Sequence, residues 1–381
     1  MDAGERVVLV HDWLTGMRGG EKCLEPMCQR WPKSRLLTLL HKPGSVSPII
    51  EQTRVQPSIL NHLPKVEQYY RYLLPLMPFA AGWRVADVDL VVSLSHAVAK
   101  SAQPPKGVPH VCYCFTPMRY AWHMKESYFG SAGFLGGLKA KAIDLLLSRI
   151  RDWDRRTADR VTHFVAISNT VRDRIRDCYN RDADVIYPPV DTEFYRPTGE
   201  AREDFYLVVS ALAPYKRFDL AVEACRKLGR QLIVIGSGQN AAKLKAQANG
   251  HTQFLGWQSD EVIRDHLRRA KALLFPGEED FGIVPLEAQA CGCPVIGYGR
   301  GGLTETVRPL GDGANATGLY FEEQTPDSVV AAIEEFERHA DRFDPRAARR
   351  NAVRFRKDRF ESELFEYLDE VTGHKLVRRV A

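Results

Sequence analysis

Short apolar runs alternate with helix-like stretches along almost the whole chain of 381 residues. Parallel strands need a crossover, usually a helix, and strands covered on both faces are apolar throughout. The alternation therefore predicts an α/β fold built on parallel sheets. The expected strands are residues 6–10, 36–40, 90–93, 110–114 and 161–167 in the first half, and 205–210, 231–235, 253–255, 272–275 and 294–298 in the second.

The length and one proline-containing segment divide the chain into two expected domains. A single hydrophobic core seldom grows beyond about 250–300 residues. Residues 187–194 contain Pro188 and Pro189, which exclude a helix there and favour an extended crossing. We therefore predict two doubly wound, Rossmann-like domains, residues 1–190 and 191–355, with the ligand site in a central cleft between them. From residue 327 on, the sequence predicts two charged helices.

Composition excludes several classes of protein. The formal net charge of +5 is mild, and no basic stripe with aromatic residues predicts nucleic acid binding. No apolar run reaches the roughly 20 residues that span a bilayer, and the N-terminus lacks the apolar core of a signal peptide. We therefore expect a cytoplasmic protein. The eight cysteines lie mostly in apolar contexts without a neighbouring histidine cluster, which predicts buried free thiols rather than a metal site.

Two segments depart from the alternation of strands and helices. Residues 69–85 are rich in aromatic residues, leucine and proline, and residues 139–160 form a cationic amphipathic helix. We expect both segments to pack on the sheet. The alternative is that one of them lies on a membrane interface.

Residues 277–302 carry the clearest functional pattern. Glu279 and Glu287 stand eight positions apart, separated by an apolar turn, and Glu287 opens an alanine-rich helix. The start of a helix offers free amides and a positive dipole end. Such a place suits a ligand that has both hydroxyls and phosphates, with carboxylates for the former and amides for the latter. The amides concerned are those of Phe281, Gly282, Ile283 and Val284.

Four further turns follow expected strands and carry glycines, cations or an aromatic residue. Glycines let the backbone approach a phosphate, and paired cations suit a diphosphate. A flat base could rest on the backbone of the last of these turns. The residues are Gly19 and Gly20, Lys216 and Arg217, Gly236 and Gly238, and Trp257.

In this order the motifs resemble those of the retaining glycosyltransferases of family four, and the resemblance covers nearly the whole chain. Residues 279–287 are similar to the E-x7-E motif of that family. Residues 11–13, 18–22 and 115–122 resemble a bacterial subgroup of mannosyltransferases for O-antigen or exopolysaccharide. The resemblance implies the α/β GT-B fold, in which two Rossmann-like domains face a cleft and a C-terminal helix, here within residues 356–381, returns to the first domain.

The resemblance also implies a role for each matched residue. Lys216 and Arg217 would neutralise the departing diphosphate, Glu279 would bind hydroxyls of the donor sugar, and Glu287 would bind the ribose. The amides of 281–284 would approach the sugar and phosphates, while Gly19 and Gly20 would let a loop close over the diphosphate. The turns with Gly236, Gly238 and Trp257 would complete the donor side. No metal or other cofactor is expected, because cations, amides and helix ends supply the positive charge.

Two positions depart from the family pattern. Ala211 stands where many relatives have an arginine, and Phe115 stands where relatives often have a histidine that contacts the donor sugar. His96 or His123 could take that place, although a lone histidine is more often structural. The residues that could contact the sugar or line the acceptor side are His96, Arg119, Tyr120 and His123.

The expected function is that of a retaining α-glycosyltransferase of bacterial surface polysaccharide synthesis. It would move mannose from GDP-mannose to a hydroxyl of a glycan acceptor linked to a polyprenyl diphosphate, with peripheral contact to the inner membrane. A UDP-sugar is the alternative donor. A sugar phosphorylase or epimerase on the same fold stays open. Ala211 and Phe115 also leave open a non-catalytic relative that only binds a nucleotide sugar.

Overall fold

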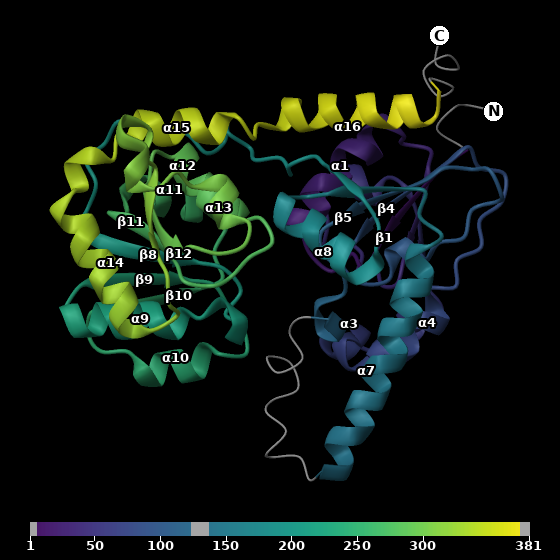
Figure 1. Ribbon diagram of the computed structural model, residues 1–381, viewed down its shortest axis with the longest axis horizontal. Helices are drawn as coiled ribbons and strands as arrows, with labels where there is room; N and C mark the ends of the chain where they lie inside the picture. Colours follow the sequence, from purple (N-terminus) through teal and green to yellow (C-terminus); the bar gives the residue numbers. More distant parts are fainter. Residues whose placement is uncertain (1–5, 123–136, 374–381) are drawn as a thin grey trace. The chain divides into compact units, whose positions relative to one another are not determined.

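The computed structural model describes residues 6–122 and 137–373 and divides the chain into two compact units (Figure 1). Unit 1 comprises Met1–Pro188 and Phe360–Ala381, and unit 2 comprises Pro189–Arg359. The first division falls inside the proline-containing segment 187–194. Each unit contains its own sheet with helices around it, which confirms the predicted α/β architecture of two Rossmann-like domains.

The sheet of unit 1 has seven parallel strands in the order β3-β2-β1-β4-β5-β6-β7. Its central strands are buried along their whole length, as expected for strands covered on both faces. The short strands β3 and β7 were missed in the sequence because they are edge strands in which no residue is buried. The strands are β1 Val7–His11, β2 Arg35–Thr38, β3 Arg54–Pro57, β4 Leu90–Ser95, β5 His110–Cys114, β6 His163–Ala166 and β7 Ala183–Val185.

The helices of unit 1 include several short α and 3-10 turns between residues 48 and 101. The α-helices are α1 Gly19–Arg30, α2 Pro48–Glu51, α3 Val66–Tyr69, α4 Met77–Ala80, α5 Arg119–Trp122, α7 Gly137–Ala158 and α8 Asn169–Tyr179. The 3-10 helices are η2 Ile59–His62, η3 Tyr70–Leu76 and η4 Ala99–Ser101.

A buried carboxylate fixes helix α7 to the rest of unit 1. Asp154 is fully buried and forms an ion pair with Lys100, which is also buried. The same carboxylate accepts hydrogen bonds from the indole of Trp122 and the hydroxyl of Tyr179, both at 2.8 Å. Three groups from separate segments thus satisfy one buried charge, which orders the packing of α7.

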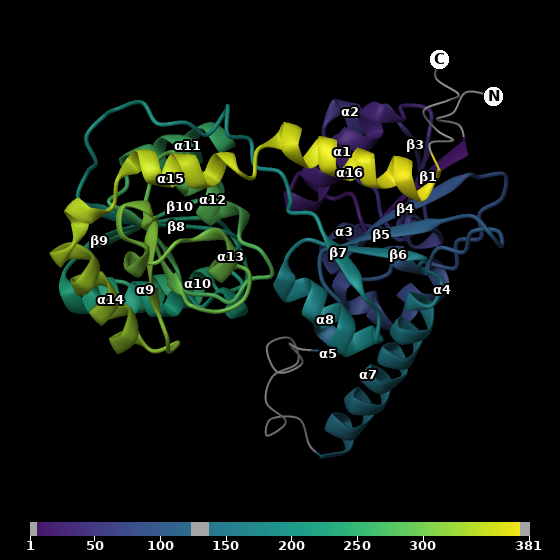
Figure 2. The same cartoon turned by 45° about the horizontal axis from the view of Figure 1, so that its top comes forward.

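The sheet of unit 2 has six parallel strands in the order β10-β9-β8-β11-β12-β13. Alternate residues of β8 face opposite sides: Tyr206 and Val208 enter one apolar core, and Leu207 and Val209 enter another. Figure 2 shows the helices on both sides of this sheet. The strands are β8 Phe205–Val209, β9 Gln231–Ile235, β10 Thr252–Gly256, β11 Ala272–Phe275, β12 Val295–Tyr298 and β13 Gly318–Phe321.

The helices of unit 2 pack against the sheet and complete those two apolar cores. The α-helices are α9 Phe218–Leu228, α10 Ala241–Gln247, α11 Asp260–Arg269, α12 Ile283–Ala290, α13 Leu303–Thr306, α14 Pro326–Arg338 and α15 Pro345–Val353. The 3-10 helices are η5 Pro214–Lys216, η6 Leu310–Asn315 and η7 Ala340–Arg342.

The C-terminal part contains three α-helices rather than the two predicted from residue 327 on. The break that the sequence analysis missed lies at Asp344-Pro345, where the Asp344 side chain accepts a hydrogen bond from the backbone of Arg346 and Pro345 opens α15. The third helix, α16 Lys357–Val371, begins in unit 2 and continues in unit 1. There Asp369 pairs with Arg30 of α1 at 2.8 Å.

Candidate functional site

The strand order of unit 2 reverses between β8 and β11, which are neighbours in the sheet. From β8 the chain winds outward through β9 and β10, and from β11 it winds the other way through β12 and β13. In open α/β sheets, ligands bind beyond the carboxyl ends of the strands at this reversal. The segments that leave β8 and β11 there carry Lys216 and Glu279.

Lys216 and Glu279 form an ion pair across this reversal. Their side chains are 13% and 12% exposed, so most of the pair is removed from water while its edge stays accessible. Gly277 allows this approach, because a Cβ there would lie 2.9 Å from the Cα of Lys216. The backbone of Glu279 is fixed from the other side, since its carbonyl accepts a hydrogen bond from the amide of Gly302 at 2.8 Å. The structure therefore brings together two of the three predicted catalytic residues.

Arg217 is next to Lys216 in sequence but is engaged elsewhere. Its backbone is in the left-handed region, with φ of 52°, and caps the start of α9. Its guanidinium donates to the carboxylate of Asp219 at 3.3 Å and to the carbonyl of Gln324 at 3.4 Å. Asp219 thus offsets the charge of Arg217, a pairing that the sequence analysis did not anticipate.

Helix α12 begins directly after this acidic segment. Gly282, with φ of 91°, is its N-cap, and the amides of Ile283 and Val284 lie in its first turn, where a helix has no internal acceptors for them. The side chain of Phe281 is buried against Phe355, so only the backbone of this residue faces the turn. The helix start therefore has the geometry that the predicted anion site requires, and the site itself stays a prediction.

Glu287 lies one turn further along α12 and is buried, with an exposed fraction of 6%. Its carboxylate is next to the hydroxyl of Tyr195. Burial, followed by the charge of Glu287 and a hydrogen bond to it, raises the pKa of Tyr195. Tyr195 therefore holds this carboxylate in place, a contact that no sequence signal indicated.

The predicted donor-side glycines lie in loops that are joined along the same edge of the sheet. The amide of Gly236 donates to the carbonyl of Gly256 at 2.7 Å, and the amide of Leu212 donates to the carbonyl of Ser237 at 2.9 Å. Gly238 follows in the same loop as Gly236. Trp257, directly after Gly256, is 76% exposed. These loops form one continuous rim beyond β8, β9 and β10.

The strand order of unit 1 also reverses, between the neighbouring strands β1 and β4. The loop after β1 leads into α1, whose first residues are Gly19 and Gly20. A Cβ at Gly20 would lie 3.2 Å from the Nε2 of His11, so this turn passes close to the end of β1. Burial lowers the pKa of His11, whose Nδ1 lies 3.0 Å from the carbonyl of Trp13. His11 and Gly20 are therefore close neighbours at the start of α1.

The carboxylate that follows β1 is the main structural feature that the sequence analysis missed. Asp12 is fully buried and accepts hydrogen bonds from the amides of His96, Ala97, Val98 and Ala99 at 2.6–2.9 Å. Its Oδ2 also lies 2.9 Å from the Nδ1 of His96. Burial alone would raise the pKa of Asp12, but the charge and hydrogen bonds of His96 hold it well below the usual value.

His96 is therefore a positioned residue rather than an isolated one. Its ring lies between Asp12 and Trp13, with centroids of the two rings 4.5 Å apart, and its side chain is 29% exposed. Of the other predicted acceptor-side residues, Arg119 opens α5, and the backbone of Tyr120 continues that helix. His123 lies outside the described residues, and so does the side chain of Tyr120.

In residues 6–122 and 137–373, no cluster of three or more His, Cys, Asp or Glu side chains has a metal-binding arrangement. All eight cysteines are free and buried, as predicted. None of the helices in these ranges has the length and apolar character needed to cross a bilayer.

Comparison with known families gives two adjoining matches. Residues 28–194 match the model described as "Glycosyltransferase Family 4", and residues 191–354 match the model described as "Glycosyl transferases group 1". The border between the two matches falls close to the division between units 1 and 2.

Similar proteins and structures come from several organisms. An uncharacterized glycosyltransferase of Methanocaldococcus jannaschii is 30% identical over 174 residues, which are 44% of this chain and 48% of that protein. A GDP-mannose-dependent alpha-(1-6)-phosphatidylinositol monomannoside mannosyltransferase of Mycobacterium tuberculosis is 28% identical over 212 residues, 48% of this chain and 54% of that protein. The chain thus spans about half the length of these two relatives. The structure of Anabaena HepE with UDP-glucose has a TM-score of 0.70 at 16% identity, covering 96% of this chain and 99% of HepE.

Proposed function

The chain belongs to the family four glycosyltransferases with the GT-B fold, and from this premise we propose that it moves a hexose from a nucleotide diphosphate sugar to a hydroxyl of a glycan acceptor, with retention of configuration. The observation that carries the proposal is the pair of Lys216 and Glu279 at the strand reversal of unit 2, beside the start of α12. A cation, a carboxylate and free amides in one place suit a ligand with both phosphates and hydroxyls.

Each group has one task in the proposed reaction. Lys216 binds the diphosphate and stabilises the negative charge that grows on it as the glycosidic bond breaks. The amides of Ile283 and Val284 bind the same phosphates, while Glu279 accepts hydrogen bonds from hydroxyls of the donor sugar. Glu287, held by Tyr195, binds the ribose. In this proposal Lys216 and these amides supply the positive charge that a metal would otherwise provide.

Retention requires that the acceptor enters on the face from which the diphosphate leaves. The departing phosphate oxygen then takes the proton of the acceptor hydroxyl, so the new bond forms as the old one breaks. A covalent intermediate would need a carboxylate nucleophile against the sugar, as in retaining glycosidases. Glu279 is assigned instead to the sugar hydroxyls because its carboxylate is already bound to Lys216.

The proposed donor is GDP-mannose, and the proposed acceptor is a lipid-linked glycan of a bacterial surface polysaccharide. The name of the Mycobacterium tuberculosis relative supports the donor, and it also describes a lipid-bound acceptor. A UDP-sugar is the second candidate, favoured by the HepE structures with UDP and UDP-glucose. In both cases the reaction takes place in the cytoplasm, on the side of the membrane that supplies nucleotide sugars.

Thermal unfolding with GDP, UDP and ADP and their sugar conjugates, without added metal, separates these donors. A ligand at 100 times its dissociation constant stabilises the folded state by about 2.7 kcal/mol, so a specific nucleotide raises the midpoint measurably. Stabilisation by GDP and GDP-mannose alone supports the first donor, and stabilisation by UDP compounds alone selects the second. No stabilisation by any nucleotide, together with no transfer product, would contradict the proposed function. The anomeric configuration of the product, read by NMR, tests retention.

A further inference from the structure

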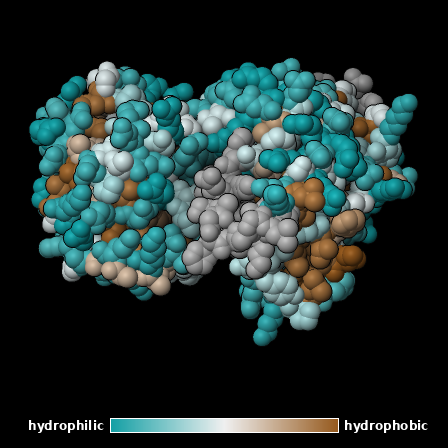
Figure 3. Space-filling view, turned by 60° about the horizontal axis from the view of Figure 1, so that its bottom comes forward, coloured by the Kyte–Doolittle hydropathy of each residue, from teal (hydrophilic) through white to brown (hydrophobic). Residues whose placement is uncertain are grey.

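The outward side of the segment from Ile59 to Phe79 in unit 1 is apolar and exposed. We call its five projecting side chains the apolar face: Ile59 is 75% exposed, Leu63 39%, Tyr72 85%, Leu76 49% and Phe79 83%. Figure 3 shows a brown area in the part of unit 1 that contains α3 and α4 in Figure 1. Scattered apolar residues are normal on a surface, but five in one short segment mark an interaction site.

The same segment also buries an apolar side. Val66, Tyr70, Leu74 and Met77 recur at intervals of three or four residues and enter the core of unit 1. A surface helix with a buried apolar stripe ordinarily presents polar residues on its other side. Here the inner stripe already accounts for folding, so the apolar residues on the outside have no role in the core.

Short turns, prolines and an anchoring serine constrain the backbone below the apolar face. The segment consists of the short turns η2, α3, η3 and α4 and contains three prolines, Pro64, Pro75 and Pro78. Ser58 anchors its start, because its hydroxyl donates to the carbonyl of Leu39 at 2.9 Å and accepts from the amide of Leu60. Fixed turns keep the large side chains in water, so little further ordering entropy is lost on binding.

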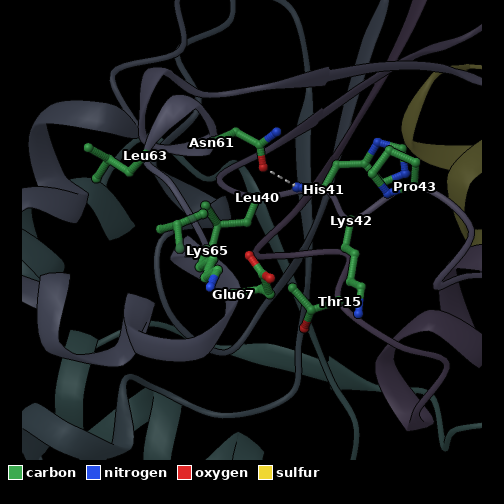
Figure 4. A pocket seen from close by; sticks show the side chains of 10 residues that line it. Thr15, Leu40, His41, Lys42, Pro43, Asn61, Leu63, Lys65 and Glu67 are labelled. Carbon is green, nitrogen blue, oxygen red and sulfur yellow. Dashed lines mark hydrogen bonds between the residues drawn. The ribbon is translucent and has the colours of Figure 1, made fainter.

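Positive charge accompanies the apolar face. Lys65, within the segment from Ile59 to Phe79, is exposed, and the same segment contains one carboxylate, Glu67. A cavity of about 200 Å³ adjoins the face, and Leu63 belongs to both (Figure 4). The polar side chains that line the cavity include the exposed Lys42 and Lys65, one carboxylate, Glu67, and the uncharged Thr15 and Asn61. Two lysines outnumber the one carboxylate in this recess, and an excess of positive charge beside an apolar surface matches an anionic head group above acyl chains.

We propose that the apolar face is the surface by which this protein docks on an anionic lipid bilayer, with Lys42 and Lys65 at the level of the phosphates. The inference rests on the proposed function for its purpose, since an acceptor held in a membrane requires the transferase to come to that surface. Aromatic and aliphatic side chains that project this far suit a deformable bilayer, and Tyr72 has the amphipathic ring typical of the interface. Insertion is peripheral, through side chains and turns.

The test is flotation of the purified full-length protein with vesicles of phosphatidylcholine, with and without phosphatidylglycerol. Neither donor nor acceptor is added, so the result does not depend on activity. The double variant Tyr72→Ser/Phe79→Ser should bind anionic vesicles about tenfold or more weakly, because it loses the two most exposed rings. Ile49→Ser is the matched control, since Ile49 is an exposed apolar residue of α2 outside the apolar face.

The second variant, Lys42→Ala/Lys65→Ala, separates charge from apolar contact. It should bind neutral vesicles like the wild type. It should lose most of the additional affinity that phosphatidylglycerol gives the wild type, and high salt should abolish that additional affinity in the wild type as well. Equal melting temperatures of all variants show that they fold, as expected for exposed positions.

Three results would overturn the proposal. The wild type would fail to float with anionic vesicles at low salt, or the ring variant would float as well as the wild type. Alternatively, light scattering would show a wild-type dimer that the ring variant converts to a monomer, without vesicle binding in either, which assigns the face to a second copy of the chain. A protein that floats but transfers no sugar keeps the docking surface and contradicts only the proposed function.

Discussion

Each unit places a carboxylate and a basic side chain at the reversal of its sheet, but the two pairs are used differently. Asp12 follows β1 and is surrounded by four amides and His96, with no exposure to water. Glu279 follows β11 and forms its ion pair with Lys216, and both side chains keep some exposure. A carboxylate whose hydrogen-bonding capacity is taken up by the protein builds structure, whereas one with an accessible edge can bind a ligand.

The largest effect should come from Asp12, the carboxylate that builds structure. Asp12→Ala leaves four buried amides without an acceptor and His96 without its partner, so the free energy of unfolding of unit 1 should fall by about 3–5 kcal/mol. Urea unfolding followed by tryptophan fluorescence measures it, since Trp13, Trp31, Trp83, Trp122 and Trp153 all lie in unit 1. Asp369→Ala, which removes the partly exposed pair with Arg30, is the control and should cost about 1 kcal/mol. Equal losses of unfolding free energy in the two variants would show that Asp12 stabilises unit 1 no more than a partly exposed ion pair does.

The pair of Lys216 and Glu279, which faces the proposed ligand, should affect catalysis more strongly than folding. Lys216→Met keeps the length of the side chain but removes the charge that faces the diphosphate, so kcat should fall by about 100-fold to 1000-fold. The unfolding midpoint should fall less than in Asp12→Ala, because Glu279 keeps an edge in contact with water while Asp12 has none. Lys227→Met is the matched control, as Lys227 pairs with Asp327 at an exposed place in the same unit. Unchanged turnover in Lys216→Met would reject the assigned site.

The two units should also respond differently to acid. In unit 1, burial lowers the pKa of His110 to about 3 from its ordinary value near 6.5. The unfolded chain then binds a proton that the folded unit does not, so stability present above pH 6.5 is lost as the pH falls toward 3. At pH 5 this amounts to about 2 kcal/mol.

In unit 2 a partly buried group with a shifted pKa, Glu337, titrates at lower pH than His110. Burial would raise the pKa of Glu337, but hydrogen bonds from Arg230, Lys271 and Tyr206 bring it down to about 2. Its contribution is present above pH 4.5 and is lost as the pH falls toward 2. Tryptophan fluorescence should therefore show unit 1 weakening between pH 7 and 5, while Glu337→Gln removes a loss that occurs only below pH 4.5. A parallel decline of both units from pH 6.5 would contradict this order.

The comparison explains what could be predicted from the sequence. The site of unit 2 was visible because Glu279, Gly282 and Glu287 lie on one turn and one helix, so their spacing alone determines their arrangement. Asp12 and its partners His96–Ala99 are more than 80 residues apart, and only the adjacency of β1 and β4 brings them together. The one available signal was a carboxylate directly after a buried strand. The apolar face was seen as a segment, but its division into a buried and an exposed side required the fold.

The smallest effect should come from Arg217, which tests whether sequence neighbours share a role. Its guanidinium is paired with Asp219 and about one third exposed, so Arg217→Ala should reduce kcat by less than about fivefold. A loss near that of Lys216→Met would mean that Arg217 leaves Asp219 when the diphosphate binds. In that case it replaces the arginine that many relatives have at the position of Ala211. Introducing Ala211→Arg into the Arg217→Ala variant would then restore activity, whereas a purely local pair with Asp219 predicts no rescue.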